Sequence, residues 1–148
     1  MTRAELTEKI RTRKRVKGRT WRDLAAEISD GSPIVTTAAL LGQMKLTHDE
    51  AAKAAAALDL DDEEEEMLAE VPYRGSLPPG PPTDPLVYRF YELVQVYGTT
   101  WKALIEEEFG DGIMSAIDFD MTMERVPDPK GDRVKLTMSG KFLPYKRY

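Results

Sequence analysis

The chain has 148 residues and a mass of 16.7 kDa, with 21 Lys and Arg against 26 Asp and Glu, one His and no Cys. A chain of this length buries about 70% of its unfolded surface, so we expect a real core, in one domain or two small ones. The lack of Cys excludes disulfides, thiolate nucleophiles and Cys-based zinc or iron–sulfur sites. The single His48 excludes a two-His metal site within one chain, and with it most hydrolase and metalloenzyme chemistry.

Neither a membrane span nor a targeting segment is recognisable. No run of about 18 apolar residues occurs, and the N-terminus lacks the apolar stretch of a secretory signal. The basic N-terminal stretch contains Glu5 and Glu8 and is poor in Ser, which is untypical of a transit peptide. We therefore predict a cytoplasmic protein without a membrane partner.

Charge is unevenly distributed along the chain. The first nineteen residues hold eight Lys and Arg against two Glu, and we interpret them as a basic arm. By contrast, seven of the eight residues from Asp59 to Glu66 are acidic. Such an acidic run is typical of a solvated helix face or a linker.

A Pro-rich segment divides the sequence. Six of the fifteen residues from Val71 to Pro85 are Pro, which fixes φ and cannot donate a hydrogen bond to a helix or a sheet. We expect an extended connector here. The predicted domains are residues 1–75, a helical bundle, and residues 76–148, a catalytic and dimerisation domain.

The first domain carries helix signals in close succession. Thr20 can cap a helix whose apolar residues follow the helical period, and Pro33 favours the start of a second helix that ends before Gly42. Thr47 and Glu50 form a capping box that opens an Ala-rich helix through Leu58. The apolar face of the first of these helices comprises Trp21, Leu24, Ala25 and Ile28. Four or five helices in about 70 residues predict an all-α bundle.

The second domain begins with a helix and then changes period. A helix from Pro85 carries an apolar stripe, and we expect Gly98 to interrupt it so that Thr100 caps a second piece ending at Phe109. Alternation of apolar and polar residues then predicts strands over 117–124 and 134–139, joined by a turn-rich segment at 127–132. The predicted fold class is therefore α+β.

Two strands with one apolar face are marginally stable alone in water. We expect a partner subunit to complete the two-stranded hairpin, so the sequence predicts an obligate homo-oligomer built through the second domain.

The helices at Thr20 and Pro33, with a turn between them, form a helix-turn-helix arrangement. Its second helix would lie in the DNA major groove and would need long polar side chains near its start. Residues 34–40 contain none, and the net charge of −5 gives little attraction to phosphate. A DNA-binding regulator is the alternative function, but we expect no nucleic-acid partner.

Three polar residues in the second domain can bear chemistry. Arg89 and Glu92 lie three apart and share a helix face, which by itself is most often an exposed ion pair. Ser115, between a Gly-rich turn and a strand, is by itself most often a turn residue. The residues alone leave both interpretations open.

An ordered series of unusual segments covers nearly all of the second domain. They are Thr83–Pro85, Tyr88–Glu92, Gln95–Thr100, Lys102–Leu104, Phe109–Ile113, Ser115–Ile117 and Gly140–Pro144. Together they resemble the cyanase family, also called cyanate hydratase or cyanate lyase. The first domain resembles it more loosely, through residues 35–43 and 58–61.

The resemblance implies bicarbonate-dependent decomposition of cyanate to ammonia and carbon dioxide, without a metal or an organic cofactor. It also implies a homodecamer, arranged as a pentamer of dimers, in which a bundle similar to lambda-repressor-like DNA-binding domains precedes an interlocking C-terminal domain. The family's catalytic residues carry over onto Arg89, Glu92 and Ser115, each within its matching segment.

The residue types suit that chemistry. Both substrates are small anions, and a guanidinium with its fixed donors can hold two anions together, which makes Arg89 the candidate anion clamp. Ser115 would donate a neutral hydrogen bond, whereas Glu92 would orient Arg89 or relay a proton. One Arg compensates a dianion poorly, so we expect sites between subunits, where further copies of Arg89 meet. His48, in a first helical turn, is expected to be exposed.

Overall fold

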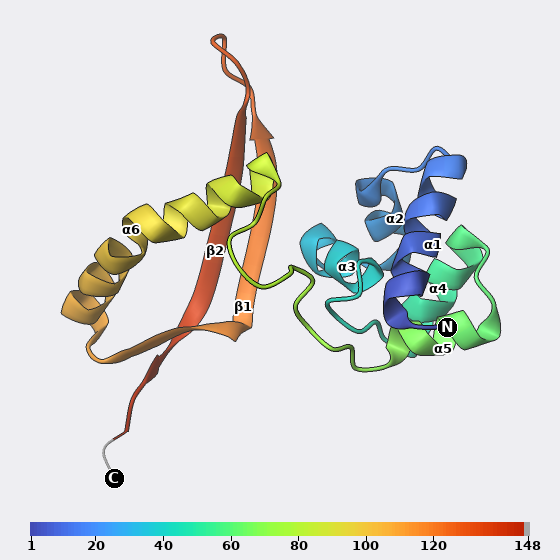
Figure 1. The fold of residues 1–148 in the computed structure, drawn as a ribbon, viewed down its shortest axis with the longest axis horizontal. Helices are drawn as coiled ribbons and strands as arrows, with labels where there is room; N and C mark the ends of the chain where they lie inside the picture. Colours follow the sequence, from blue (N-terminus) through green and yellow to red (C-terminus); the bar gives the residue numbers. More distant parts are fainter. Residues whose placement is uncertain (147–148) are drawn as a thin grey trace. The chain divides into compact units, whose positions relative to one another are not determined.

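The structure is a computed structural model that describes residues 1–146. Six helices precede a two-stranded sheet of order β1-β2 (Figure 1). The elements are α1 (Arg3–Val16), α2 (Trp21–Ile28), α3 (Pro33–Leu40), α4 (His48–Leu58), α5 (Asp62–Ala69), α6 (Pro85–Phe109), β1 (Gly112–Val126) and β2 (Arg133–Pro144). The chain divides into two compact units, Met1–Gly75 with Met121–Thr137, and Ser76–Asp120 with the chain from Met138.

Helices α1 to α5 form the predicted bundle, and local capping explains where they begin. The side chains of four N-cap residues each accept a hydrogen bond from the backbone N–H three residues on. The Glu or Asp at that third position accepts in return from the backbone N–H of the N-cap residue. The four N-cap residues are Thr2, Thr20, Thr47 and Asp61. These boxes satisfy N–H groups that a helix leaves without partners. The predicted starts of α2, α3 and α4 are confirmed, and His48 is exposed at the start of α4.

Hydrogen bonds hold the carboxylates of three of these capping boxes in their charged form. The backbone of Thr2 lowers the pKa of Glu5, and the side chain of Thr20 lowers the pKa of Asp23. The side chain of Ser29 is the main cause of the lowered pKa of Glu50. All three groups therefore stabilise the folded bundle only while they are ionised.

The basic stretch at the N-terminus is helical, since residues 3–16 form α1. Leu6 and Ile10 are fully buried in the bundle core, four residues apart on one face of that helix. Two apolar positions among many cations gave too weak a periodic signal to predict a packed helix. The core also contains Leu24, Ile28, Leu40, Leu58 and Leu68.

The acidic run is likewise more than a solvated surface. Glu64 in α5 is 1% exposed, and its carboxylate lies 2.5 Å from the Nζ of Lys9 in α1. Asp59 accepts a contact of 2.8 Å from Lys17 and lies 3.9 Å from Arg13. Charges of opposite sign that are far apart in the sequence therefore meet between α1 and the α4–α5 region.

Helix α6 is continuous, so the expectation that Gly98 interrupts it was wrong. Gly98 has no positive φ, and Thr100 lies within the helix rather than capping a new one. A Gly inside a helix costs about 1 kcal/mol relative to Ala, which a helix of 25 residues can absorb. The helix begins where expected, with Asp84 accepting from the N–H groups of Leu86 and Val87.

Strands β1 and β2 confirm the predicted α+β class and extend beyond the predicted segments at both ends. The hairpin turn contains Asp128, whose carbonyl accepts from the N–H of Gly131. The addition of a partner subunit to the hairpin stays a prediction.

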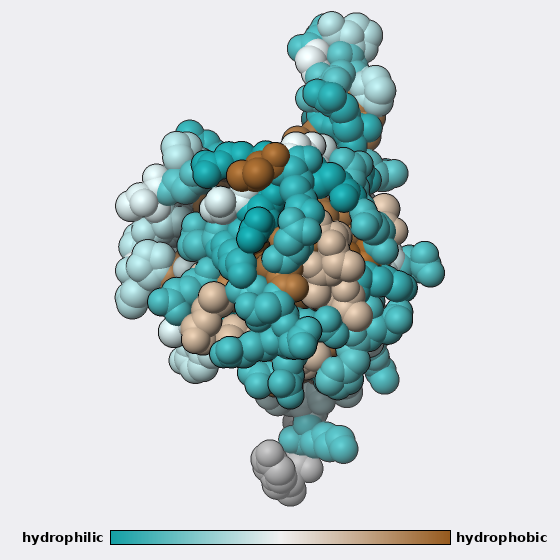
Figure 2. Space-filling view, turned by 90° about the vertical axis from the view of Figure 1, so that its right-hand side faces the viewer, coloured by the Kyte–Doolittle hydropathy of each residue, from teal (hydrophilic) through white to brown (hydrophobic). Residues whose placement is uncertain are grey.

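The two parts of the chain differ in how well they bury apolar side chains. The face of the bundle turned to the viewer in Figure 2 is mostly hydrophilic, as expected where the large apolar side chains are buried inside. In contrast, α6 buries no residue. Large apolar side chains are exposed along α6 and the hairpin, among them Leu86 (69%), Leu104 (58%), Ile117 (97%) and Val134 (75%). Continuous apolar exposure of this kind marks surfaces that associate.

Candidate active site

Arg89 and Glu92 lie in the first two turns of α6, and their spacing brings them to one side of the helix. The Nη1 of Arg89 is 3.9 Å from the Oε2 of Glu92, and the two side chains are 65% and 50% exposed. The guanidinium also lies 5.9 Å from the ring centroid of Tyr88. An exposed pair at this distance contributes at most a few tenths of a kcal/mol, so Arg89 retains donors for an anion.

Ser115 occupies a different environment, in β1. It is 4% exposed and is the only buried residue among residues 76–146. Its Oγ accepts hydrogen bonds from the backbone N–H of Ile117, at 3.0 Å, and of Asp118, at 2.9 Å. A hydroxyl has two acceptor lone pairs and one donor, so both lone pairs are engaged and only the hydrogen remains to be given.

The three candidate residues are not joined in a single chain. Across residues 1–146, no hydrogen bond or ion pair links Ser115 to Arg89 or to Glu92. Arg89 lies near the start of α6 and Ser115 near the start of β1, with most of the helix between them in the chain. Their association in one site stays a prediction.

Another cation of α6 is committed elsewhere. Lys102 forms an ion pair with Glu106 one turn on, and this hydrogen bond raises the pKa of Lys102. We therefore do not count Lys102 among the candidate anion ligands.

In the part of the chain that the structure describes, no group of three or more His, Cys, Asp or Glu side chains is arranged to hold a metal ion. Within the same residues, no helix combines the length and apolar character that crossing a bilayer requires.

Comparison with known families identifies the chain. A family model for the cyanate lyase C-terminal domain matches residues 79–147, and one for the cyanate hydratase N-terminal domain matches residues 3–72. The chain belongs to the cyanate hydratase family. Proteins named cyanate hydratase from Methylibium petroleiphilum and Dechloromonas aromatica are each 60% identical to it over 148 residues, which is the whole of both chains.

A solved relative agrees in fold. The crystal structure of cyanase from T. urticae superposes with a TM-score of 0.80 at 35% identity, covering 94% of this chain and 96% of that chain. The resemblance found in the sequence is thus confirmed, and the members of this family are lyases.

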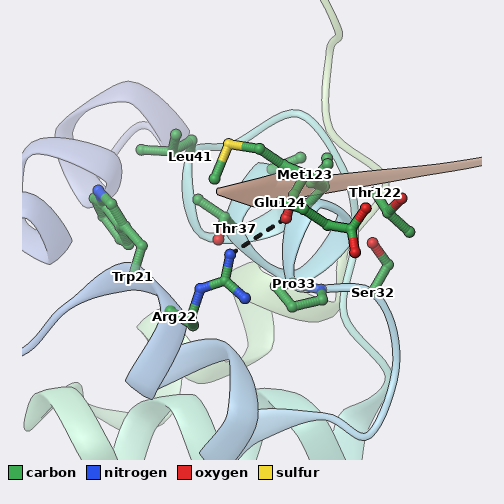
Figure 3. Close-up of a pocket in the computed structure, with 11 residues that line it drawn as sticks. Trp21, Arg22, Ser32, Pro33, Thr37, Leu41, Thr122, Met123 and Glu124 are labelled. Atoms are coloured by element: carbon green, nitrogen blue, oxygen red, sulfur yellow. Dashed lines mark hydrogen bonds between the residues drawn. The ribbon is translucent and has the colours of Figure 1, made fainter. Parts of the chain in front are cut away.

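Membership of the cyanate hydratase family does not favour the DNA-binding alternative, and the first unit offers a physical reason. A cavity of about 720 Å³ lies at the start of α3, between Pro33 and Thr37 on the helix side and Met123 on the strand side (Figure 3). The Nη2 of Arg22 donates to the carbonyl of Met123 at 3.4 Å, and the Oγ of Ser32 donates to the carbonyl of Met121 at 3.1 Å. The helix end that would read DNA bases therefore faces strand residues of its own unit.

Proposed function

We propose that this chain catalyses the bicarbonate-dependent decomposition of cyanate to ammonia and carbon dioxide, by way of carbamate. The observation that carries the proposal is the full-length identity of 60% to proteins named cyanate hydratase. Arg89, Glu92 and Ser115 are the proposed catalytic residues.

The reaction needs charge compensation more than a strong nucleophile. An oxygen of bicarbonate attacks the cyanate carbon, and the bicarbonate proton passes to the cyanate nitrogen, which gives a dianionic adduct. The adduct loses one carbon dioxide and takes up a proton to become carbamate. Carbamate takes up a second proton and breaks down to ammonia and the second carbon dioxide. Donors fixed around the adduct lower its free energy without rearranging during the reaction.

Arg89 is the proposed anion clamp. Its side chain is 65% exposed and its only ion pair among residues 1–146 is the long one to Glu92. A guanidinium can offer parallel N–H donors to two oxygens of a carboxylate-like group, and its charge offsets the repulsion between two anions.

Ser115 is the proposed neutral donor. Because its Oγ already accepts from Ile117 and Asp118, its hydroxyl can contribute to a ligand only by donating. A group that can only donate selects for an anion over a cation or a hydrogen-bond donor.

Glu92 cannot help to bind a dianion while it is ionised. Its position 3.9 Å from Arg89 supports a role in orienting the guanidinium or in relaying a proton to the nitrogen. Replacement by Gln separates these roles, since an amide can still accept a hydrogen bond from Arg89 but cannot relay a proton as a carboxylate does.

We further propose that the active sites form between subunits of a homodecamer, a pentamer of dimers. The exposed apolar side chains of α6 and the hairpin support association, and the exposure of Arg89 and Glu92 supports a site that one chain leaves incomplete. Further copies of Arg89 brought by neighbouring subunits would balance the second negative charge of the adduct.

The proposed mechanism uses bicarbonate as a co-substrate and no metal or organic cofactor. Activity that persists after dialysis against a chelator, and without any added cofactor, is the expected result. The cytoplasmic location is likewise a proposal, to be tested by cell fractionation followed by immunodetection.

The deciding assay measures ammonia released from cyanate by purified protein, with and without bicarbonate. We expect release only with bicarbonate, and we expect Arg89→Lys and Ser115→Ala each to lose at least about 100-fold of it while the sedimentation mass is unchanged. Lys keeps the positive charge but not the fork of donors, so the Arg89→Lys variant isolates the geometry of the clamp. Activity of both variants within threefold of wild type would reject these site assignments.

A further inference from the structure

We propose that Gly140 of β2 is a positioning residue for Ser115, because the missing side chain makes room for a bulge in β1 that fixes the serine hydroxyl. This inference rests on the proposed catalytic role of Ser115. It assigns a function to a residue that carries no chemical group of its own.

Strand β1 is irregular beside Gly140. A Cβ built on Gly140 would lie 2.4 Å from the carbonyl oxygen of Ser115 and 3.3 Å from the Cδ2 of Phe119. In a regular strand, residues four apart are separated by about 13 Å. Here a single position on β2 lies close to both Ser115 and Phe119, so the backbone between these two residues spans less than that length. The segment 115–119 therefore bulges away from the ladder.

The cross-strand contacts on either side agree. Towards the turn, the Nζ of Lys135 lies 3.6 Å from the Oε2 of Glu124. Towards the open end, a Cβ on Gly112 would lie 2.4 Å from the carbonyl oxygen of Leu143. From one contact to the other, β1 advances twelve positions (124 − 112) and β2 only eight (143 − 135), so β1 accommodates the excess in a bulge.

The bulge is also what engages the hydroxyl. The N–H groups of Ile117 and Asp118 can both reach the Oγ of Ser115 only where the backbone turns, because successive N–H groups of an extended strand point to opposite sides. The same turn buries Ser115 to 4% exposure. The position and the donor-only state of the hydroxyl thus depend on the bulge.

Gly140 permits this arrangement for a steric reason. Its φ is not positive, so its backbone conformation is open to any residue. However, a methyl group at this position would overlap the backbone oxygen of Ser115, and the Cγ of Met114 would be 2.6 Å away. The flexible Met114 side chain can move aside, but the Ser115 oxygen can move only with its strand, so any side chain at 140 displaces Ser115.

The test compares Gly140→Ala with Ser115→Ala, with both changes together, and with Gly98→Ala as a matched control. A Cβ on Gly98 would meet only the Cγ1 of Val94, at an ordinary 3.6 Å, so this control should keep wild-type activity. We expect Gly140→Ala to lower kcat/KM for cyanate about 100-fold, the effect of a misplacement near 1 Å. In the Ser115→Ala background, Gly140→Ala should change the remaining rate less than threefold, because the group on which it acts is gone.

A second measurement does not depend on activity. Hydrogen exchange of a peptide covering residues 113–119 reports the N–H groups of Ile117 and Asp118, and we expect exchange at least tenfold faster in Gly140→Ala than in wild type. If Gly140→Ala does not assemble, Met114→Ala with Gly140→Ala is measured instead, since it removes the side-chain contact and keeps the backbone one. We expect it to assemble and to remain impaired.

The possible results separate the two proposals. A wild-type protein that releases no ammonia from cyanate with bicarbonate rejects the proposed function, while the exchange measurement still tests the placement of Ser115. The inference on Gly140 is overturned if Gly140→Ala keeps activity within threefold of wild type or leaves exchange over 113–119 unchanged. It is also overturned if its effect on kcat/KM is as large without the Ser115 hydroxyl as with it.

Discussion

Replacing Lys9 by Met removes the cation that faces the buried carboxylate of Glu64. The two groups are 2.5 Å apart, and their side chains are 30% and 2% exposed. Taking one partner from a buried ion pair costs about 3–5 kcal/mol, because the remaining charge is left without compensation. Here Lys9 is partly solvated and Glu64 keeps the N–H of Asp61 at 3.0 Å, so we expect the bundle to lose about 2–3 kcal/mol.

A matched control isolates the effect of burial. Lys53 pairs with Asp49 at 2.9 Å, but these side chains are 51% and 80% exposed. Lys53→Met makes the same chemical change and should shift the urea midpoint very little, because solvent screens both charges. Combining Lys9→Met with Glu64→Gln should recover part of the loss, since a neutral amide needs no counter-charge.

The assay follows urea unfolding of the bundle by the fluorescence of Trp21, in a Trp101→Phe background that silences the other Trp. We expect a clearly lower midpoint for Lys9→Met than for Lys53→Met. Equal midpoints for these two variants would refute the reasoning. The Lys9–Glu64 pair would then contribute no more to stability than a solvated surface pair.

Three further predictions concern the chain more widely. The capping-box carboxylates of Glu5, Asp23 and Glu50 have lowered pKa values in the folded bundle. The stability that they contribute is therefore present above about pH 4 and is lost as the pH falls through their folded-state pKa. We expect the urea midpoint of unfolding to decline from pH 5 to pH 3. Gly98→Ala should raise the thermal midpoint, because Ala is favoured over Gly by about 0.5–1 kcal/mol inside a helix; a lower midpoint would mean that another chain approaches closely at that point. Leu104→Glu changes a side chain that is 58% exposed in one chain, so it should reduce the sedimentation mass if α6 is an interface and leave it unchanged if it is not.

Elements governed by local chemistry could be predicted from the sequence. The capping boxes at Thr20 and Thr47 and the Pro at position 33 mark the beginnings of three helices, and the structure places helices there. The two strands were predicted from alternation alone, with shorter bounds than the structure shows. In these cases the signal and the structure depend on the same few neighbouring residues.

Features that depend on distant parts of the chain were missed. The burial of Glu64 requires Lys9, which is 55 residues away, so an acidic run in α5 gave no sign of it. Gly98 reads as a helix break from local propensity, yet the helix continues through it. The bulge at Ser115 depends on Gly140 across the hairpin, and a pattern of alternating residues cannot reveal such an irregularity.

The candidate site could be predicted residue by residue but not as an assembled site. Arg89 and Glu92 follow from helical spacing and from the family resemblance, and their exposed pairing in one chain agrees with that spacing. Ser115 by itself is most often a turn residue and is assigned through the family resemblance, whereas its burial and its two N–H donors are visible only in the structure. Whether the three residues meet depends on contacts between subunits, which remain a prediction.

The most direct test of the proposed function is the release of ammonia from cyanate by the purified full-length chain. With bicarbonate present, we expect ammonia to appear together with two equivalents of carbon dioxide, and without bicarbonate we expect no release above the uncatalysed rate. Ammonia release that is equally fast without bicarbonate would contradict the proposed mechanism, and the absence of release in its presence would contradict the proposed function.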